Sequence, residues 1–307
     1  MGDPSEAPFC RTASLAIGAP LAATATSPTD VWFVLEYRGT WAAKAWPAAE
    51  LAPDVRAHVD AFVAGHPRAR IQLMRHAESR DRAEPQLVLA SSRPGATGVV
   101  RFQMQSYDDL RAIDLDDALD VLRAGGLPAG AEHVADPILL VCTNGKRDRC
   151  CAKWGQPLYD ALRSRRDAAV WQTTHVGGHR YAPTLVWLPE GLCFGRVPLA
   201  DGDRLVDGLV NRHVVDLDWY RGRTALSEPA QAVEHAVRVA TGALGFDDVE
   251  IDEVIDVDDH VRGVARANGI VFRVELVRET TTDLAPGSCG KPLEAVQRWR
   301  TLACTSD

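Results

Sequence analysis

Residues 137–151 read Pro-Ile-Leu-Leu-Val-Cys-Thr-Asn-Gly-Lys-Arg-Asp-Arg-Cys-Cys. The apolar run Pro137-Ile-Leu-Leu-Val141 is short and continuous, which predicts a strand buried on both faces. After a polar loop, further elements are expected in the order helix 155–166, strand 168–173, strands 184–188 and 192–197, and helix 201–212. The order βαβ and then ββα predicts an α/β unit that is compatible with a thioredoxin-like sheet.

A second α/β unit is predicted upstream, and a different pattern downstream. Upstream, strands are expected at 31–36, 70–74, 86–90 and 98–103, and helices at 53–64 and 114–124. Beyond residue 214, a helix at 229–244 precedes strands at 248–257, 261–267 and 270–279. The fold class is therefore α/β with a small α+β tail. The expected domains are a flexible segment 1–28, an amino-terminal α/β domain 29–130, a central domain 137–213 and a carboxyl-terminal α+β region 214–307.

The composition is that of a folded, water-soluble protein. The chain has 307 residues, 46% of them hydrophobic and 25% charged, which suits two or three domains. No apolar run approaches the roughly 20 residues that a bilayer requires. The net charge of −8 disfavours binding to nucleic acid or to an anionic membrane. The seven cysteines are an odd number spread along the chain, unlike a secreted disulfide framework, so we expect a reducing, cytoplasmic location.

Cysteine and histidine side chains follow two strands of the central unit. Cys142 and Cys151 bound the loop after the first strand, and His175-Val-Gly-Gly-His179 follows the second. Open α/β sheets place their ligand sites at the carboxyl ends of strands. Two thiols and two imidazoles at one sheet edge are the ligands that zinc and iron prefer, so the sequence predicts a metal centre there.

The spacing favours a [2Fe-2S] cluster over a single zinc ion. Eight residues separate Cys142 from Cys151, whereas about two to four separate the cysteines of a structural zinc hairpin. Gly177 and Gly178 disfavour a helical zinc-binding histidine pair and allow the loop N–H groups to approach bridging sulfides. A cysteine-histidine patch that takes up adventitious zinc is the simpler alternative.

Charge predicts how such a cluster would behave. Thiolates bind iron, and basic side chains surround the two cysteines and favour the ionised sulfur: Lys146, Arg147, Arg149 and Lys153. With two thiolates and two neutral imidazoles an oxidised cluster is neutral, whereas four thiolates would leave it doubly negative. The reduction potential should therefore lie above the value of about −400 mV of plant-type ferredoxins. Because a ligating imidazole has a second nitrogen, we expect reduction to depend on pH.

These residues resemble the sucraseferredoxin-like family, whose members carry a thioredoxin-like [2Fe-2S] ferredoxin domain. The resemblance rests on the Cys-x8-Cys loop containing Arg147-Asp148, on His175-Val-Gly-Gly-His179-Arg180-Tyr-Ala182, and on Leu188-Pro-Glu-Gly-Leu-Cys-Phe-Gly-Arg196. It covers 137–213 well and the amino-terminal unit more loosely, through Phe33-Val-Leu-Glu-Tyr-Arg-Gly-Thr-Trp41, with a degenerate thioredoxin-like domain as one interpretation of that unit. The family's ligand set implies Cys142, Cys151, His175 and His179 here, with Cys150 as the alternative second thiolate.

Other polar residues and cysteines receive weaker assignments. Residues expected beside the ligands, where they could orient the loops, are Cys150, Arg147, Asp148, Gly177, Gly178 and Arg180. For Cys289, in a loop after Pro286-Gly287, we favour a structural role and leave open an approach to the cluster or to a partner. Cys193 is expected to be a small buried hydrophobe. Cys10 and Cys304 lie in expected tails and are assigned no role.

The function predicted is single-electron transfer rather than an enzyme with its own substrate. The partner would be a reductase or an acceptor protein that binds transiently, and the oligomeric state is not assigned. The sequence has no nucleotide-binding glycine motif of a self-contained NAD(P)H oxidoreductase. The main alternative is a cluster-based redox or pH sensor or binding protein. A remote one is a histidine-phosphatase-like enzyme that uses Arg75 and His76, although Ala77 replaces the glycine of that motif.

Overall fold

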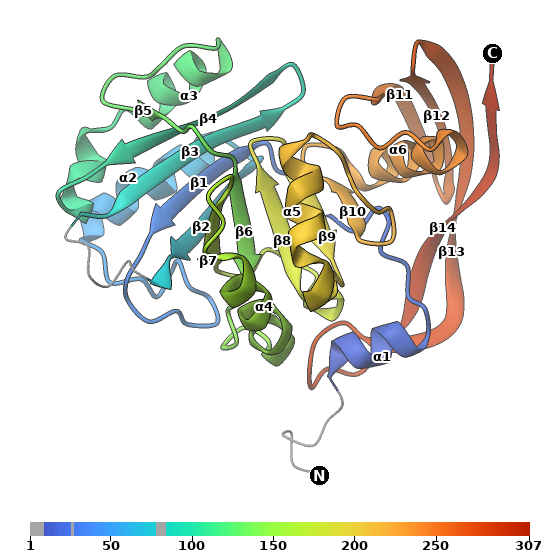
Figure 1. Ribbon diagram of the computed structural model, residues 1–307, viewed down its shortest axis with the longest axis horizontal. Coiled ribbons are helices and arrows are strands. Elements are labelled where there is room, and N and C mark those ends of the chain that lie inside the picture. Colours follow the sequence, from blue (N-terminus) through green and yellow to red (C-terminus); the bar gives the residue numbers. More distant parts are fainter. Residues whose placement is uncertain (1–8, 26–27, 78–83) are drawn as a thin grey trace.

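The computed structural model describes residues 9–25, 28–77 and 84–307 (Figure 1). Its α-helices are α1 (Cys10–Ala16), α2 (Pro53–Gly65), α3 (Leu115–Arg123), α4 (Arg149–Leu162), α5 (Gly202–Val210) and α6 (Glu228–Thr241). The strands of the first sheet are β1 (Val31–Glu36), β2 (Ala69–Arg75), β3 (Gln86–Arg93), β4 (Ala96–Gln103), β5 (Glu132–His133), β6 (Ile138–Cys142), β7 (Ala169–Thr173), β8 (Thr184–Leu188), β9 (Leu192–Gly195) and β10 (Tyr220–Arg223). The strands of the second are β11 (Val249–Val257), β12 (His260–Ala267), β13 (Ile270–Pro286) and β14 (Leu293–Ser306).

Two α/β halves share the ten-stranded sheet, whose order is β10-β9-β8-β6-β7-β2-β1-β3-β4-β5. β1 and β2 run parallel in the first half, and β6 and β7 run parallel in the second. The halves join where β2 pairs antiparallel with β7, through Met74 opposite Thr173 and Arg75 opposite Gln172. The fold is therefore mixed α/β, as the sequence predicted.

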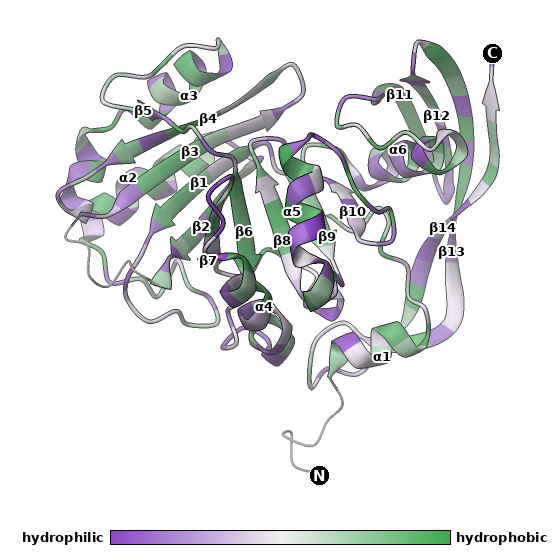
Figure 2. Ribbon diagram, viewed as in Figure 1, coloured by the Kyte–Doolittle hydropathy of each residue, from purple (hydrophilic) through white to green (hydrophobic). Residues whose placement is uncertain are grey.

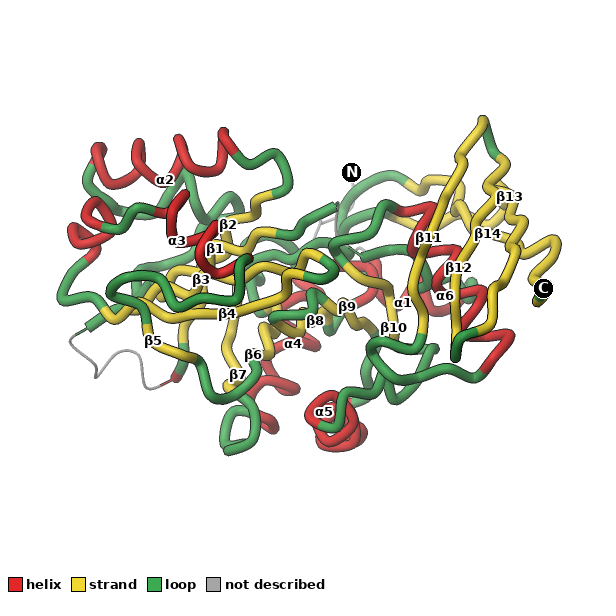
Figure 3. The backbone as a smooth tube through the Cα atoms, turned by 90° about the horizontal axis from the view of Figure 1, so that it is seen from above, coloured by secondary structure: helices red, strands yellow, loops and turns green. Residues whose placement is uncertain are grey.

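The two halves pack against each other face to face. Alternation along β1 places Phe33 in a core with α2 and α3, and Trp32 in a shared core with β6. Along β6, Leu140 faces the shared core, while Leu139 packs with α4 and α5. The layers are accordingly helix, sheet, sheet and helix (Figure 3). The central strands are enclosed on both faces, which explains their continuous apolar sequences. Figure 2 accordingly shows these strands in the colour of hydrophobic residues.

The carboxyl-terminal region is an antiparallel meander, β11-β12-β13-β14, with α6 packed on it. Its last hairpin is long, since β13 has 17 residues and β14 has 14. That hairpin runs from the meander down to α1, so its tip lies next to the amino-terminal helix (Figure 1). Two segments from opposite ends of the sequence thus meet beside the central unit.

Several elements differ from the sequence predictions. The prediction that the cysteine helix begins at Gly155 was wrong, because α4 begins at Arg149. The Asp148 side chain accepts a hydrogen bond from the Cys150 N–H and starts the helix there. Of the segment 1–28 that was expected to be flexible, residues 1–8 and 26–27 lie outside the described residues, and within the rest α1 forms and buries Cys10. β10 and β14 were not predicted, and the division into domains stays a prediction.

Among the described residues, no helix combines the length and the apolar character needed to cross a bilayer.

Candidate metal centre

The four predicted ligands come from two loops at the carboxyl ends of β6 and β7. Cys142 ends β6, and Cys151 lies in the first turn of α4. His175 follows β7, and His179 begins a short 3-10 helix, His179–Tyr181. Because β6 and β7 are parallel neighbours, with Cys142 opposite Thr173, both loops leave the sheet at the same edge.

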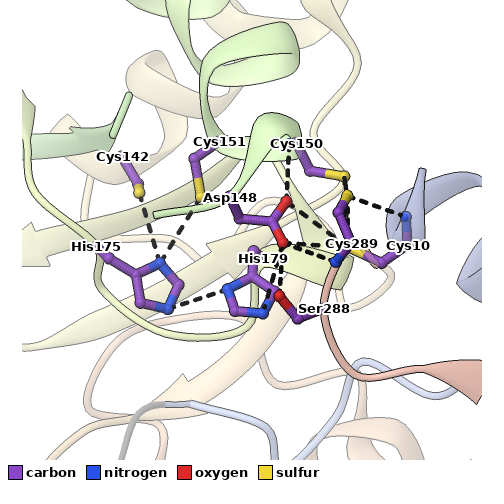
Figure 4. Close-up of polar contacts among 9 residues, drawn as sticks. All are labelled: Cys10, Cys142, Asp148, Cys150, Cys151, His175, His179, Ser288 and Cys289. Carbon is purple, nitrogen blue, oxygen red and sulfur yellow. Dashed lines mark hydrogen bonds and ion pairs between the residues drawn. The ribbon is translucent and has the colours of Figure 1, made fainter. Parts of the chain in front are cut away.

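The His175 ring faces the thiols of Cys142 and Cys151, and the His179 ring lies next to that of His175 (Figure 4). The His175 Nδ1 lies 3.7 Å from the Cys151 Sγ and 4.0 Å from the Cys142 Sγ. The His175 Nε2 lies 3.2 Å from the Nδ1 of His179, and the two rings are 4.7 Å apart at 31°. The structure therefore brings together two sulfur and two imidazole donors.

The thiols of Cys142 and Cys151 affect each other's ionisation. Hydrogen bonding from Cys151 holds the pKa of the Cys142 thiol well below its ordinary value, and His175 adds to the effect against the opposing effect of burial. The same hydrogen bond raises the pKa of Cys151. Both side chains are 0% exposed. Cys142 is therefore the thiol of this pair that ionises more readily, and a bound metal would displace the thiol protons.

His179 is held in its neutral form. Burial lowers the pKa of His179, and the neighbouring His175 lowers it further. A neutral imidazole can donate a nitrogen lone pair to a metal, which a protonated one cannot. The His179 side chain is only 12% exposed, and its Nε2 lies 3.8 Å from the Asp148 carboxylate.

Two arginines, the half-buried Arg70 and the buried Arg221, hold the histidine loop in place. Arg70 donates to the His175 carbonyl at 2.9 Å, and Arg221 donates to the Gly177 carbonyl at 3.2 Å. Gly178 has φ +70°, and a Cβ there would lie 2.3 Å from an Arg221 nitrogen. This position therefore requires glycine. Burial lowers the pKa of both arginines, and the two guanidiniums interact electrostatically with Cys142, so they offset thiolate charge at the centre.

Asp148 is the hydrogen-bond acceptor at the start of α4. Its Oδ1 accepts from the Cys150 N–H at 2.8 Å. Its Oδ2 accepts from the Cys289 N–H and the Ser288 hydroxyl, each at 2.9 Å. Burial alone would raise the pKa of Asp148, but the N–H groups of Cys289 and Cys150 outweigh it and lower the pKa to about 2. The carboxylate is therefore ionised at neutral pH.

The other residues expected beside the ligands lie in different settings. The N–H of Arg147 donates to the Asn144 carbonyl at 3.1 Å within the cysteine loop. The guanidinium of Arg180 lies over the Tyr181 ring, 5.1 Å from its centre. Cys150 turns away from His175, and its Sγ lies 3.4 Å from the Sγ atoms of Cys10 and Cys289.

Cys10 and Cys289 were not predicted to belong together. Cys289 carried one usable signal, its position in a glycine-containing loop that could approach the centre. Cys10 carried none, because it lies in an alanine-rich segment that has no chemical motif. Cys193 is buried on β9 and Cys304 lies on β14.

The residues of the phosphatase-like motif pack among aromatic rings. The Arg75 guanidinium lies 4.0 Å from the centre of the Trp41 ring. The His76 ring contacts Trp171 and Tyr159 edge to face, at 5.6 and 6.0 Å. The rest of that motif, residues 78–79, lies outside the described residues.

Known proteins with similar sequences or structures cover parts of this chain. "Altered inheritance of mitochondria protein 32" of Meyerozyma guilliermondii is 33% identical over 101 residues, which is 30% of this chain and 36% of that protein, so the chain spans about a third of its length. The wild-type thioredoxin-like [2Fe-2S] ferredoxin of Aquifex aeolicus, solved at 1.5 Å, is 17% identical and covers 25% of this chain and 88% of its own, with a TM-score of 0.23. A second structure of a thioredoxin-like [2Fe-2S] ferredoxin from Aquifex aeolicus, 18% identical, covers 24% of this chain and 79% of its own, with a TM-score of 0.21.

Both TM-scores are low, and the fold stated above rests on the strand order of this chain itself. The sucrase/ferredoxin-like family model matches residues 23–222, which is well over half of the chain. The matched range includes both α/β halves and all four predicted ligands. The chain therefore belongs to the sucrase/ferredoxin-like family.

Proposed function

We propose that the protein is a [2Fe-2S] electron carrier whose cluster is held by Cys142, Cys151, His175 and His179. The observation that supports it best is the convergence of two buried thiols and two half-buried imidazoles at one edge of the sheet. The family membership and the donor chemistry agree, since cysteine and histidine together ligate [2Fe-2S] centres. When bound, such a cluster takes up and releases one electron at a time.

The chain's own residues would set the conditions for that transfer. Cys142 and Cys151 would supply sulfur from fully buried positions, which limits the access of solvent to the metal. Arg70 and Arg221 hold the carbonyls of the histidine loop and place positive charge near the thiolates. His175 and His179 each have a second ring nitrogen that can hold or release a proton, so we expect a pH-dependent potential above that of four-cysteine ferredoxins.

The first test is the visible spectrum, with iron and acid-labile sulfide assays, on the full chain purified anaerobically. We expect about two irons and two sulfides per chain. His175→Cys should shift the absorption bands, and Cys151→Ser should abolish them. Cys304→Ser is the matched control, because it removes a thiol on β14 that lies outside the centre.

A colourless, iron-free protein from iron-replete cells would overturn the proposal. A coloured protein that accepts no electron from any reductase, but changes conformation on oxidation, would instead support the sensor function. Stopped-flow reduction by a ferredoxin reductase, followed at the visible bands, separates these two results.

A further inference from the structure

A second group of sulfur atoms lies next to the candidate cluster ligands (Figure 4). Cys10 begins α1, Cys150 lies in the first turn of α4, and Cys289 lies between β13 and β14. The Sγ of Cys150 is 3.4 Å from the Sγ of Cys10 and 3.4 Å from that of Cys289, and the last two are 3.7 Å apart. Both carboxylate oxygens of Asp148 lie 3.9 Å from the Cys10 Sγ.

These distances match one metal ion. Four ligands arranged tetrahedrally around zinc, with Zn–S bonds of about 2.3 Å, place the sulfurs about 3.8 Å apart. A disulfide would require about 2.05 Å and would leave the third cysteine unpaired. The triangle of sulfurs is therefore of the size that a single ion needs.

We propose that Cys10, Cys150, Cys289 and Asp148 form a structural Zn²⁺ site, separate from the site for the [2Fe-2S] cluster. Three thiols and one carboxylate are a donor set suited to a borderline-soft ion with tetrahedral preference. As three S–Zn bonds form, the thiol protons pass to the solvent and Zn²⁺ keeps its oxidation state. Cys10 and Cys150 are 0% exposed and Cys289 is half-buried. Four protein donors would fill all the coordination positions, as they do in structural zinc sites.

The surroundings offset the charge of this site. Three thiolates, one carboxylate and Zn²⁺ together carry a net charge of about −2. Basic side chains of α1 and α4 lie around it: Lys153 and Arg149 stack on the Phe9 ring at 4.0 and 4.9 Å, and Arg11 stacks on Trp154 at 4.7 Å. Phe9 and Trp154 contact each other at 5.1 Å and pack against the hydrophobic cluster that contains Cys10 and Cys150.

The zinc site would tie together three distant parts of the chain. Cys10 and Cys150 are 140 positions apart, and Cys150 and Cys289 are 139 apart. One ion would thereby fasten the amino-terminal helix and the tip of the β13–β14 hairpin to α4. Binding that closes such long loops stabilises the folded state strongly, because the unfolded chain has no preformed site.

The test is the metal content of the full chain, purified anaerobically after growth with both iron and zinc. Wild type should hold about one zinc per chain besides its iron. Cys289→Ser should lower the zinc about tenfold or more, with the iron content and visible spectrum unchanged. Cys304→Ser, the matched control, should keep its zinc, and Cys142→Ser should lose iron but keep zinc.

The two sites are thus distinguished by separate metals and separate variants. Added Co²⁺ should give thiolate-to-cobalt charge-transfer and tetrahedral d–d bands in zinc-free wild type but not in Cys289→Ser. Wild type without zinc and without these cobalt bands would overturn the zinc site. So would unchanged zinc in both Cys289→Ser and Cys10→Ala, or a disulfide among Cys10, Cys150 and Cys289 in the anaerobic protein by intact mass. If zinc is lost only in Cys142→Ser, the zinc binds at the site proposed for the [2Fe-2S] cluster. That result would contradict both the zinc site and the electron-carrier proposal.

Discussion

The Asp148 carboxylate accepts a hydrogen bond from the Cys289 N–H at 2.9 Å, across 141 positions of the chain. The same carboxylate caps α4 through the Cys150 N–H and lies 3.8 Å from the His179 Nε2. One side chain therefore connects the start of the cysteine helix, the carboxyl-terminal hairpin and a candidate cluster ligand. A substitution of Asp148 should therefore disturb the start of α4, the carboxyl-terminal hairpin and the position of His179.

Asp148→Ala should lower the free energy of unfolding by about 2 kcal/mol, because it removes a helix cap and leaves buried N–H groups unpaired. Urea denaturation in the presence of a chelator measures this loss apart from any metal. Asp114→Ala is the matched control, since the Asp114 carboxylate caps α3 by accepting an exposed hydrogen bond from the Asp117 N–H. Equal losses in the two variants would contradict the role given to Asp148.

Gly155→Ala should disturb the centre from inside α4. A Cβ at Gly155 would lie 2.0 Å from the Cys142 carbonyl oxygen, so the helix would have to move away from β6. We expect a loss of about 1–3 kcal/mol in unfolding free energy, together with lower iron content. Gly65→Ala, at the end of α2, meets nothing within 4 Å and should leave both quantities nearly unchanged. If Gly155→Ala holds as much iron as Gly65→Ala, α4 can shift without loss of iron, and the prediction is wrong.

Glu234→Gln should destabilise the carboxyl-terminal part of the fold. Glu234 is 0% exposed and accepts hydrogen bonds from Arg238 at 3.0 Å and Arg223 at 3.1 Å. Removing its charge leaves the Arg238 and Arg223 guanidiniums without an ionised partner in a buried position, at a cost of about 3–5 kcal/mol. Glu250→Gln, which breaks an exposed ion pair with Arg266, should change stability by less than about 1 kcal/mol.

The effect of Glu234 should depend on pH. Burial raises the pKa of Glu234, but Arg238 and Arg223 outweigh it and hold the pKa below its ordinary value. The stability that the carboxylate supplies is thus present above the ordinary glutamate pKa of about 4.3 and is lost as the pH falls through the depressed value. The difference between wild type and Glu234→Gln should shrink over that acidic range in urea titrations. A difference that grows on acidification would refute the assignment.

His179→Cys should lower the reduction potential and weaken its dependence on pH. It replaces a neutral donor by a thiolate, and the added negative charge disfavours electron uptake. In wild type the potential should fall as the pH rises, because reduction is coupled to proton uptake on imidazole. Potentiometric titration at several pH values measures both effects. His213→Ala, at an exposed residue that pairs with Gly245, is the control and should match wild type.

Much of the local structure could be predicted because it is set by periodicity within a few residues. β1, α2, β6 and β7 lie close to their expected positions, since continuous apolar runs and helix-spaced apolar residues report burial directly. The start of α4 was missed because Gly155 was taken as a boundary. The cap at Asp148 is supplied by a side chain that is itself held by a distant hairpin.

The sequence by itself determined the α/β pattern and the two ligand loops, because a strand, its following loop and a parallel neighbour are encoded within some forty residues. The tertiary structure alone decided which partners the thiols of Cys150 and Cys151 meet. Adjacent residues of a helix point about 100° apart, so one thiol faces His175 and the other faces Cys10 and Cys289. Only the packing of α1 and the β13–β14 hairpin on α4 brings those three sulfurs together, since contacts across 139 or more positions leave no local pattern in the chain.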